Sequence, residues 1–219
     1  MKAMILAAGK GERMGELVAS CPKPLLPLGD KSLIERMILA LKHNGFNEII
    51  INVFYLAKQI QDKLQDGKKY GVSIKYSVEH ELLDTGGGIA NALPLLGAAP
   101  FLVVSGDIFT DYPFTKLRAT REANLAHLVL IDAKSNQQKA DFNLENGMVL
   151  ANENPFYTYA NIGVYRADFF CNKKKIFPLG ATLKEQIKNK TVSGEIFSGL
   201  WRNVNNQKSL EVLRAEFNS

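Results

Sequence analysis

Residues 3–13 read AMILAAGKGER, an apolar run that opens into a glycine-rich loop. The run over 3–7 has no polar residue, which is typical of a strand buried on both faces of a sheet. Gly9 and Gly11 lack a Cβ, so their loop lets backbone N–H groups approach a phosphate closely, and Arg13 adds positive charge. Taken alone, the stretch is equally consistent with a plain strand-to-helix turn, because it matches neither the Rossmann glycine pattern nor a Walker loop.

Residues 1–131 alternate short apolar runs with helical patterns. The periodicity and the turn residues predict strands over 3–7, 48–53, 72–76, 101–104 and 126–131, and helices over 32–44, 56–64 and 88–96. Continuous apolar strands separated by helices favour a mostly parallel sheet that is covered on both faces.

Residues 132–219 have shorter strand candidates. Asn146-Gly147 predicts a tight hairpin turn, further strands are expected over 159–165 and 191–197, and a helix over 210–217. The predicted fold class is therefore α/β. We expect one domain over 1–219, a three-layer sandwich whose mostly parallel, mixed sheet has helices on both faces, with a small C-terminal strand-rich lobe.

The composition excludes several classes of protein. Of 219 residues, 46% are hydrophobic and 22% are charged, with a net charge of +5, which excludes disorder, collagen, a coiled coil and a membrane protein as the main class. No apolar run reaches the ~20 residues of a membrane span. The opening run is too short for a secretory signal, and two cysteines make neither a disulfide framework nor a zinc cluster. We expect a cytoplasmic protein with no nucleic-acid partner, because its charges form no basic stripe.

Three further motifs carry chemistry. Pro22-Lys23-Pro24 fixes the backbone on each side of one lysine and so aims a cation. Residues 79–88 read EHELLDTGGG, where three glycines before a helix would let the backbone receive a flat or anionic ligand. Asp107 follows an apolar strand, at the edge where open α/β sheets bind ligands, and a carboxylate there suits Mg²⁺.

These motifs, in this order, resemble those of the sugar-1-phosphate nucleotidyltransferases, which carry a glycine-rich loop with an arginine, Pro-Lys-Pro, a Thr-Gly-rich turn and Gly-Asp. The resemblance continues through residues 159–165 and 193–195 and spans nearly the whole chain. Residues 66–71, 82–88 and 92–97 look especially like the uridylyltransferases that act on N-acetylmuramate 1-phosphate. Many relatives carry an added C-terminal β-helix domain, and we expect none in a chain of this length.

The resemblance implies an enzyme that transfers a nucleotidyl group from a nucleoside triphosphate to a sugar 1-phosphate, with Mg²⁺ as cofactor and as a monomer or homodimer. Residues 1–131 would form the nucleotide-binding half and residues 132–219 the sugar-binding half. Matching motif positions assign the nucleotide to Ala7, Ala8, Gly9, Gly11, Arg13, Gly86 and Gly87; the sugar to Asn161 and Glu153; catalysis to Lys23, Arg13 and Asp107; and the metal to Asp107 and Asn203.

The chain departs from the family pattern at two places. Relatives usually end the site with Trp-x-Asp-x-Gly-Thr, whereas residues 201–206 read WRNVNN, so Asn203 replaces the second metal-binding carboxylate and weaker metal binding is expected. Relatives also tend to have Arg-x-x-Pro-Leu-Thr where residues 13–18 read RMGELV, which loses the proline and adds Glu16 close to a triphosphate.

Two functions from different classes follow. An active enzyme would use UTP with N-acetylmuramate 1-phosphate as its first substrate pair, or GTP with mannose 1-phosphate as its second. A catalytically impaired paralogue would bind a nucleotide or nucleotide-sugar without turnover and act as a sensor or partner, with Asn203 as the reason. A redox Rossmann enzyme is disfavoured, because the first loop lacks the third glycine of that pattern.

Overall fold

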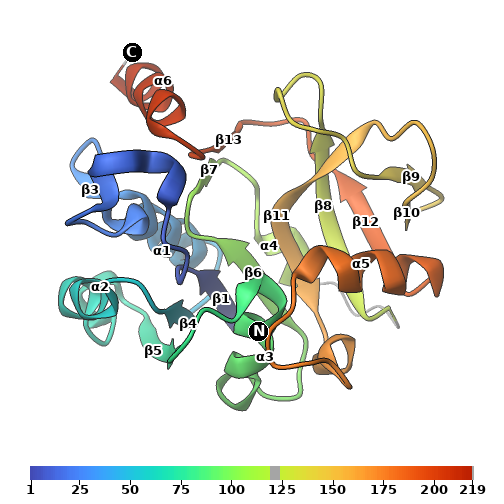
Figure 1. Cartoon of the computed structure of the whole chain (residues 1–219), viewed down its shortest axis with the longest axis horizontal. Coiled ribbons are helices and arrows are strands. Elements are labelled where there is room, and N and C mark those ends of the chain that lie inside the picture. Colours follow the sequence, from blue (N-terminus) through green and yellow to red (C-terminus); the bar gives the residue numbers. More distant parts are fainter. Residues whose placement is uncertain (119–123, 219) are drawn as a thin grey trace.

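A computed structural model describes residues 1–118 and 124–218. Its framework is a nine-stranded sheet in the order β5-β4-β1-β6-β11-β8-β12-β10-β9 (Figure 1). The strands are β1 (Ala3–Leu6), β4 (Glu48–Val53), β5 (Ser73–Val78), β6 (Phe101–Ser105), β8 (Ala126–Asp132), β9 (Asn143–Glu145), β10 (Met148–Leu150), β11 (Tyr157–Tyr165) and β12 (Val192–Ile196). Strands β5, β4, β1 and β6 are parallel, β11 runs antiparallel to its two neighbours, and β12 is parallel to β8. The predicted mixed, mostly parallel α/β sheet is confirmed.

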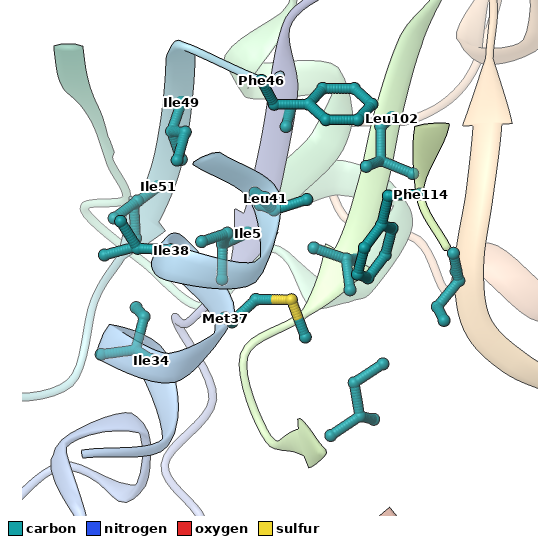
Figure 2. Close-up of a cluster of buried hydrophobic side chains, with 14 of the residues drawn as sticks. Ile5, Ile34, Met37, Ile38, Leu41, Phe46, Ile49, Ile51, Leu102 and Phe114 are labelled. Atoms are coloured by element: carbon teal, nitrogen blue, oxygen red, sulfur yellow. The ribbon is translucent and has the colours of Figure 1, made fainter. Parts of the chain in front are cut away.

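Helices cover both faces of the sheet and make the three layers. One face carries α1 (Leu33–His43), α2 (Ala57–Leu64) and α4 (Thr115–Arg118), and the other carries α3 (Asp84–Leu96) and α5 (Leu179–Lys188). Strand β1 shows why both faces are apolar, because Ala3 and Ile5 pack on the α1 side whereas Met4 packs on the α3 side. Figure 2 shows Ile38 and Leu41 of α1 beside the strand residues Ile5 and Ile51, all in one buried cluster.

The start of α1 is fixed by its sequence. The Ser32 hydroxyl donates to Glu35 Oε2 over 2.7 Å and the Ser32 N–H donates to the same oxygen over 3.0 Å, as in a capping box. Gly45 follows the helix with a left-handed φ of 80°, which glycine adopts without strain. Both ends of the predicted helix are confirmed.

The remaining elements lie outside the main sheet. They are the 3-10 helices η1 (Glu12–Val18), η2 (Lys23–Leu25), η3 (Lys68–Tyr70) and η4 (Ala167–Phe170), the paired strands β2 (Pro27–Leu28) and β3 (Lys31–Ser32), the paired strands β7 (Ile108–Thr110) and β13 (Trp201–Asn203), and α6 (Gln207–Asn218). The β7–β13 pair brings residues 201–203 beside the segment that follows β6. Within the described parts of the chain, no helix is long and apolar enough to cross a membrane.

Candidate functional site

A cavity of ≈ 940 Å³ opens where the parallel strands end. Leu6, Asn52, Glu79 and Ser105 line it from the ends of β1, β4, β5 and β6. Parallel strands all present their carboxyl ends at one edge of the sheet, which is where ligands bind in open α/β folds. The glycine-rich loop at 9–13 lines the same cavity. The sheet therefore gathers the first sequence motif and the ends of four strands around one space.

Lys23 and Asp107 form an ion pair in this cavity. The Lys23 residue is only 7% exposed, and its backbone lies between two prolines at the start of η2. The Ser105 hydroxyl donates to Asp107 Oδ1 over 2.5 Å and so holds the carboxylate on its other oxygen. A cation held among buried groups is suited to neutralise a phosphate, because the low local dielectric strengthens the interaction.

Asn203 enters the cavity from the opposite end of the sequence. It pairs with Ile108 in the β13–β7 ladder, and the Val204 N–H donates to the Asp107 carbonyl over 3.0 Å. The Asn203 side-chain oxygen is buried and has no hydrogen-bond partner. A buried acceptor without a donor is costly unless a ligand supplies one.

The donor set at Asp107 and Asn203 fits a hard divalent cation in part. One carboxylate and one amide oxygen line the same cavity, and oxygen is the donor such cations prefer. Across the described residues, no group of three or more His, Cys, Asp or Glu side chains could hold a metal ion. Substrate phosphate oxygens would therefore have to complete the coordination, as is usual for magnesium at nucleotide sites.

The glycine-rich loop turns tightly at Gly11 and leaves open space at Gly9. Gly11 has a left-handed φ of 68°, and a Cβ there would lie 3.2 Å from Lys23 Cβ, so a larger residue would press on the lysine. A Cβ at Gly9 would meet no atom within 4 Å. Arg13 Nη2 donates to Asn205 Oδ1 over 3.4 Å, which ties the loop to the chain segment after β13. Ala7 and Ala8, which the family resemblance assigns to the nucleotide, also line the cavity.

A buried polar network that the sequence did not reveal joins three strand ends. Asn52 Oδ1 accepts the Ala7 N–H over 2.9 Å, and Asn52 Nδ2 donates to Glu79 Oε1 over 2.7 Å. Glu79 Oε2 accepts the Leu83 N–H over 3.2 Å, which extends the network to the start of α3. Desolvation by burial raises the pKa of the Glu79 carboxyl, against the hydrogen bonds that lower it. The only signal in the sequence is a polar residue at the end of each apolar strand.

The predicted sugar residues are placed differently from one another. Asn161 lies in β11 with a left-handed φ of 58° and lines the cavity. Glu153 is exposed in the segment between β10 and β11, outside the lining of the cavity. The structure therefore brings Asn161, but not Glu153, together with Lys23, Asp107 and Asn203.

The expectation of an open glycine-rich turn before a helix is wrong. Helix α3 already begins at Asp84, so the glycines lie inside it. A Cβ at Gly86 would lie 2.3 Å from Phe177 Cε2, and one at Gly87 would lie 2.4 Å from the Lys175 carbonyl. Because Gly86 and Gly87 have no side chain, residues 175–177 can pack directly against the helix. The Gly87 N–H donates to the Phe177 carbonyl over 3.1 Å.

The contact between residues 175–177 and α3 changes which residues of the 79–88 stretch face the cavity. Asp84 and Thr85 line it, whereas Gly86 and Gly87 do not. The assignment of Gly86 and Gly87 to the nucleotide therefore stays a prediction carried by the family resemblance alone.

Comparison with known proteins agrees with this geometry. Residues 2–210 match the nucleotidyl transferase family. Over 214 residues, 93% of each chain, the sequence is 42% identical to N-acetylmuramate alpha-1-phosphate uridylyltransferase of Neisseria meningitidis serogroup B. Over 118 residues, 54% of this chain and 52% of the relative, it is 36% identical to D-glycero-alpha-D-manno-heptose 1-phosphate guanylyltransferase of Campylobacter jejuni.

Solved structures share the fold. HddC from Yersinia pseudotuberculosis superposes with a TM-score of 0.82 at 17% sequence identity, covering 99% of both chains. Since the family match spans nearly the whole sequence and the relatives are named for nucleotidyl transfer to sugar 1-phosphates, the chain belongs to the nucleotidyl transferase family and is an enzyme of its sugar-1-phosphate nucleotidyltransferase group.

Proposed function

We propose that this enzyme transfers a uridylyl group from UTP to N-acetylmuramate 1-phosphate, with Mg²⁺, giving a nucleotide-sugar and pyrophosphate. The observation that carries the proposal is the meeting of Lys23, Asp107 and Asn203 in the cavity that the glycine-rich loop lines. The 42% identity over nearly the full length of the Neisseria uridylyltransferase supports this substrate pair. GTP with mannose 1-phosphate is the second pair, because guanylyltransferases are also among the relatives.

The proposed reaction is an in-line displacement at phosphorus. An oxygen of the sugar phosphate attacks the α-phosphorus of the triphosphate, a new P–O bond forms, and the bond to the bridging oxygen of the β-phosphate breaks to release pyrophosphate. No protein nucleophile is required. The barrier would fall because the protein positions the two reactants and neutralises the charge that develops on the α-phosphate.

Each residue in the cavity has a role in this proposal. Lys23 would exchange its bond to Asp107 for the α-phosphate, and Arg13 would hold the β- and γ-phosphates from the rim. Asp107 and Asn203 would hold the magnesium ion, which when bound adds positive charge beside the phosphates. Asn161 would bind a sugar hydroxyl, and Glu153 could join it only if the segment between β10 and β11 moves toward the cavity.

The two halves of the chain would divide the work. Most of the lining comes from residues before 131, while Asn161, Ile176, Asn203 and Asn205 come from the second half. This distribution supports a nucleotide-binding half over 1–131 and a sugar-binding half over 132–219. A cytoplasmic location and a monomer or homodimer remain part of the proposal.

One observation favours a second candidate, a paralogue that binds nucleotide or nucleotide-sugar but turns over poorly. The amide at Asn203 cannot supply the negative charge of a carboxylate, so the cation would bind less tightly. This reading predicts nucleotide binding that is nearly independent of magnesium, with no pyrophosphate above background.

The test is pyrophosphate release across four nucleoside triphosphates and a panel of sugar 1-phosphates, with Mg²⁺ and Mn²⁺, for the wild type and Asn203→Asp. Asn206→Asp is the matched control, because it adds the same charge at a position outside the cavity lining. Wild-type turnover with UTP and N-acetylmuramate 1-phosphate supports the first proposal. Turnover only in Asn203→Asp supports the second, and silence in both with no nucleotide binding would refute both.

A further inference from the structure

Strand β11 is distorted where it passes the cavity. On its β8 side the register jumps between Tyr159, opposite Leu130, and Gly163, opposite Leu128, so residues 160–162 face the single residue Val129. Asn161 sits in this bulge with its φ of 58°. A left-handed non-glycine residue within a strand is unfavourable, and it persists only where the surrounding structure fixes it. Bulges of this kind re-aim a side chain next to a site.

One side chain from another part of the fold holds the bulge. Trp201 Nε1–H donates to the Ala160 carbonyl over 2.9 Å, and both residues are buried, at 2% and 0% exposure. The bulge takes this carbonyl out of the regular ladder with β8, so it needs another donor. Without the indole, a buried carbonyl would be left unpaired beside a strained residue.

The same tryptophan belongs to the strand that carries Asn203. Trp201 and Asn203 are the first and last residues of β13, two positions apart, so their side chains project to the same face of the strand. Pairing of Trp201 with Thr110 and of Asn203 with Ile108 fixes that strand beside the cavity. The indole thus joins the strand with the predicted metal ligand to the bulge with the predicted sugar ligand.

We infer that Trp201 is a positioning residue for the sugar end of the site: its N–H holds the Ala160–Asn161 bulge and thereby fixes Asn161 relative to Asn203. The inference uses the proposed function for its kinetic assay, while the bulge itself is open to direct measurement. If it holds, loss of the N–H weakens sugar phosphate recognition before it weakens nucleotide recognition, because the glycine-rich loop does not depend on this bond.

The first test compares Trp201→Phe with Tyr112→Phe. Tyr112 lies in the same buried cluster, is also 2% exposed, and donates its hydroxyl to Glu195 over 2.6 Å. Each substitution deletes one donor from the same core and leaves a phenyl ring there. Trp201→Phe also removes the five-membered ring of the indole, so we expect it to lose more thermal stability than Tyr112→Phe. The KM for sugar 1-phosphate should rise roughly three- to tenfold in Trp201→Phe only, with the KM for the triphosphate changed less than about twofold. Equal KM changes in the two variants would overturn the inference.

A second test does not depend on turnover. Trp201 is the one tryptophan in the sequence, so growth of a tryptophan auxotroph on benzothienylalanine replaces its N–H by sulfur while keeping the bicyclic shape. Amide hydrogen exchange of residues 157–165 should become faster in this protein, and in Trp201→Phe, but not in Tyr112→Phe. Unchanged exchange in both Trp201-modified proteins would overturn the inference. Failure of the wild type to turn over would count against the proposed function alone.

Discussion

Lys23 and Asp107 form an ion pair, although 84 positions separate them in the sequence. The lysine side chain is 9% exposed and the carboxylate 24%. In the proposed reaction each would need its charge for something else, the lysine for the α-phosphate and the carboxylate for a cation. The ion pair therefore holds two groups of opposite charge side by side in the cavity. Binding of the phosphate to Lys23 and of the cation to Asp107 would have to break this ion pair.

This exchange of partners predicts that Lys23→Met and Asp107→Asn each lower kcat about 10²- to 10³-fold, as loss of one charge-stabilising group typically does. Pyrophosphate release at saturating substrates measures the effect. Lys31→Met is the control, since Lys31 also pairs with a carboxylate, that of Asp30, but on the exposed surface. Comparable losses of activity in Lys31→Met would show that the effect comes from net charge rather than from the site.

Sequence motifs identified Lys23 and Asp107 one at a time, because the local backbone around each is restricted by its neighbours, but they did not predict that the two side chains pair. Prolines on both sides of Lys23 restrict its backbone, and Asp107 follows an apolar strand whose carboxyl end faces ligands in this class of sheet. The positions of strands and helices could also be predicted from local sequence, because the spacing of apolar residues shows which face of each element is buried. The glycine-rich loop, Lys23 and Asp107 were singled out in this way, whereas Asn203 was assigned through the family resemblance; all four line one cavity.

Long-range contacts were not predictable. A sequence shows that residues 86 and 87 are small but not that residues 175–177 pack on them, so the glycines were interpreted as a site for a ligand. Asn52 and Glu79 are single polar residues at strand ends, and only the fold joins them. Asn161 is a residue type that tolerates a left-handed φ, but the bulge itself is defined by the pairing of β11 with β8, which residues 159–165 alone do not show.

Gly9→Ala should separate folding from nucleotide binding. A Cβ at this position would meet no atom within 4 Å, and Gly9 has no left-handed φ, so we expect a stability change of no more than about 0.5 kcal/mol. The added methyl group would occupy the cavity next to the loop, and the KM for the triphosphate should rise about tenfold, the equivalent of roughly 1.4 kcal/mol of overpacking. An unchanged KM for the triphosphate would show that the nucleotide does not bind next to Gly9.

Burial of Glu79 predicts a specific pH dependence of stability. Its pKa is raised in the folded protein, so between the ordinary value and the raised value the folded state binds more protons than the unfolded state. The contribution of Glu79 therefore falls as pH rises through that window. Glu79→Gln lacks this titration, and its melting temperature relative to wild type should increase as the pH rises above the ordinary carboxyl pKa of about 4.3.

Glu48→Gln is the control for Glu79, because Glu48 is exposed at the start of the neighbouring strand β4. Thermal unfolding followed by circular dichroism at several pH values measures both differences. Parallel curves for wild type and Glu79→Gln would show that the hydrogen bonds from Asn52 and Leu83 offset the effect of desolvation on the pKa of Glu79. The variant should also weaken nucleotide binding, since the network holds Ala7 in place.

Gly87→Ala tests whether the glycines of α3 serve the fold or the ligand. A Cβ at Gly87 would lie 2.4 Å from the Lys175 carbonyl, a backbone atom that can yield only if residues 175–177 move, and we expect a loss of about 1–3 kcal/mol in the free energy of unfolding. Gly180→Ala is the opposite case, because its Cβ would meet nothing within 4 Å in α5, and it should stabilise by up to about 1 kcal/mol. Urea unfolding midpoints measure both. Should Gly87→Ala keep wild-type stability and lose only nucleotide affinity, the contact with residues 175–177 would be incidental and the ligand role assigned to Gly87 by the family resemblance would be correct.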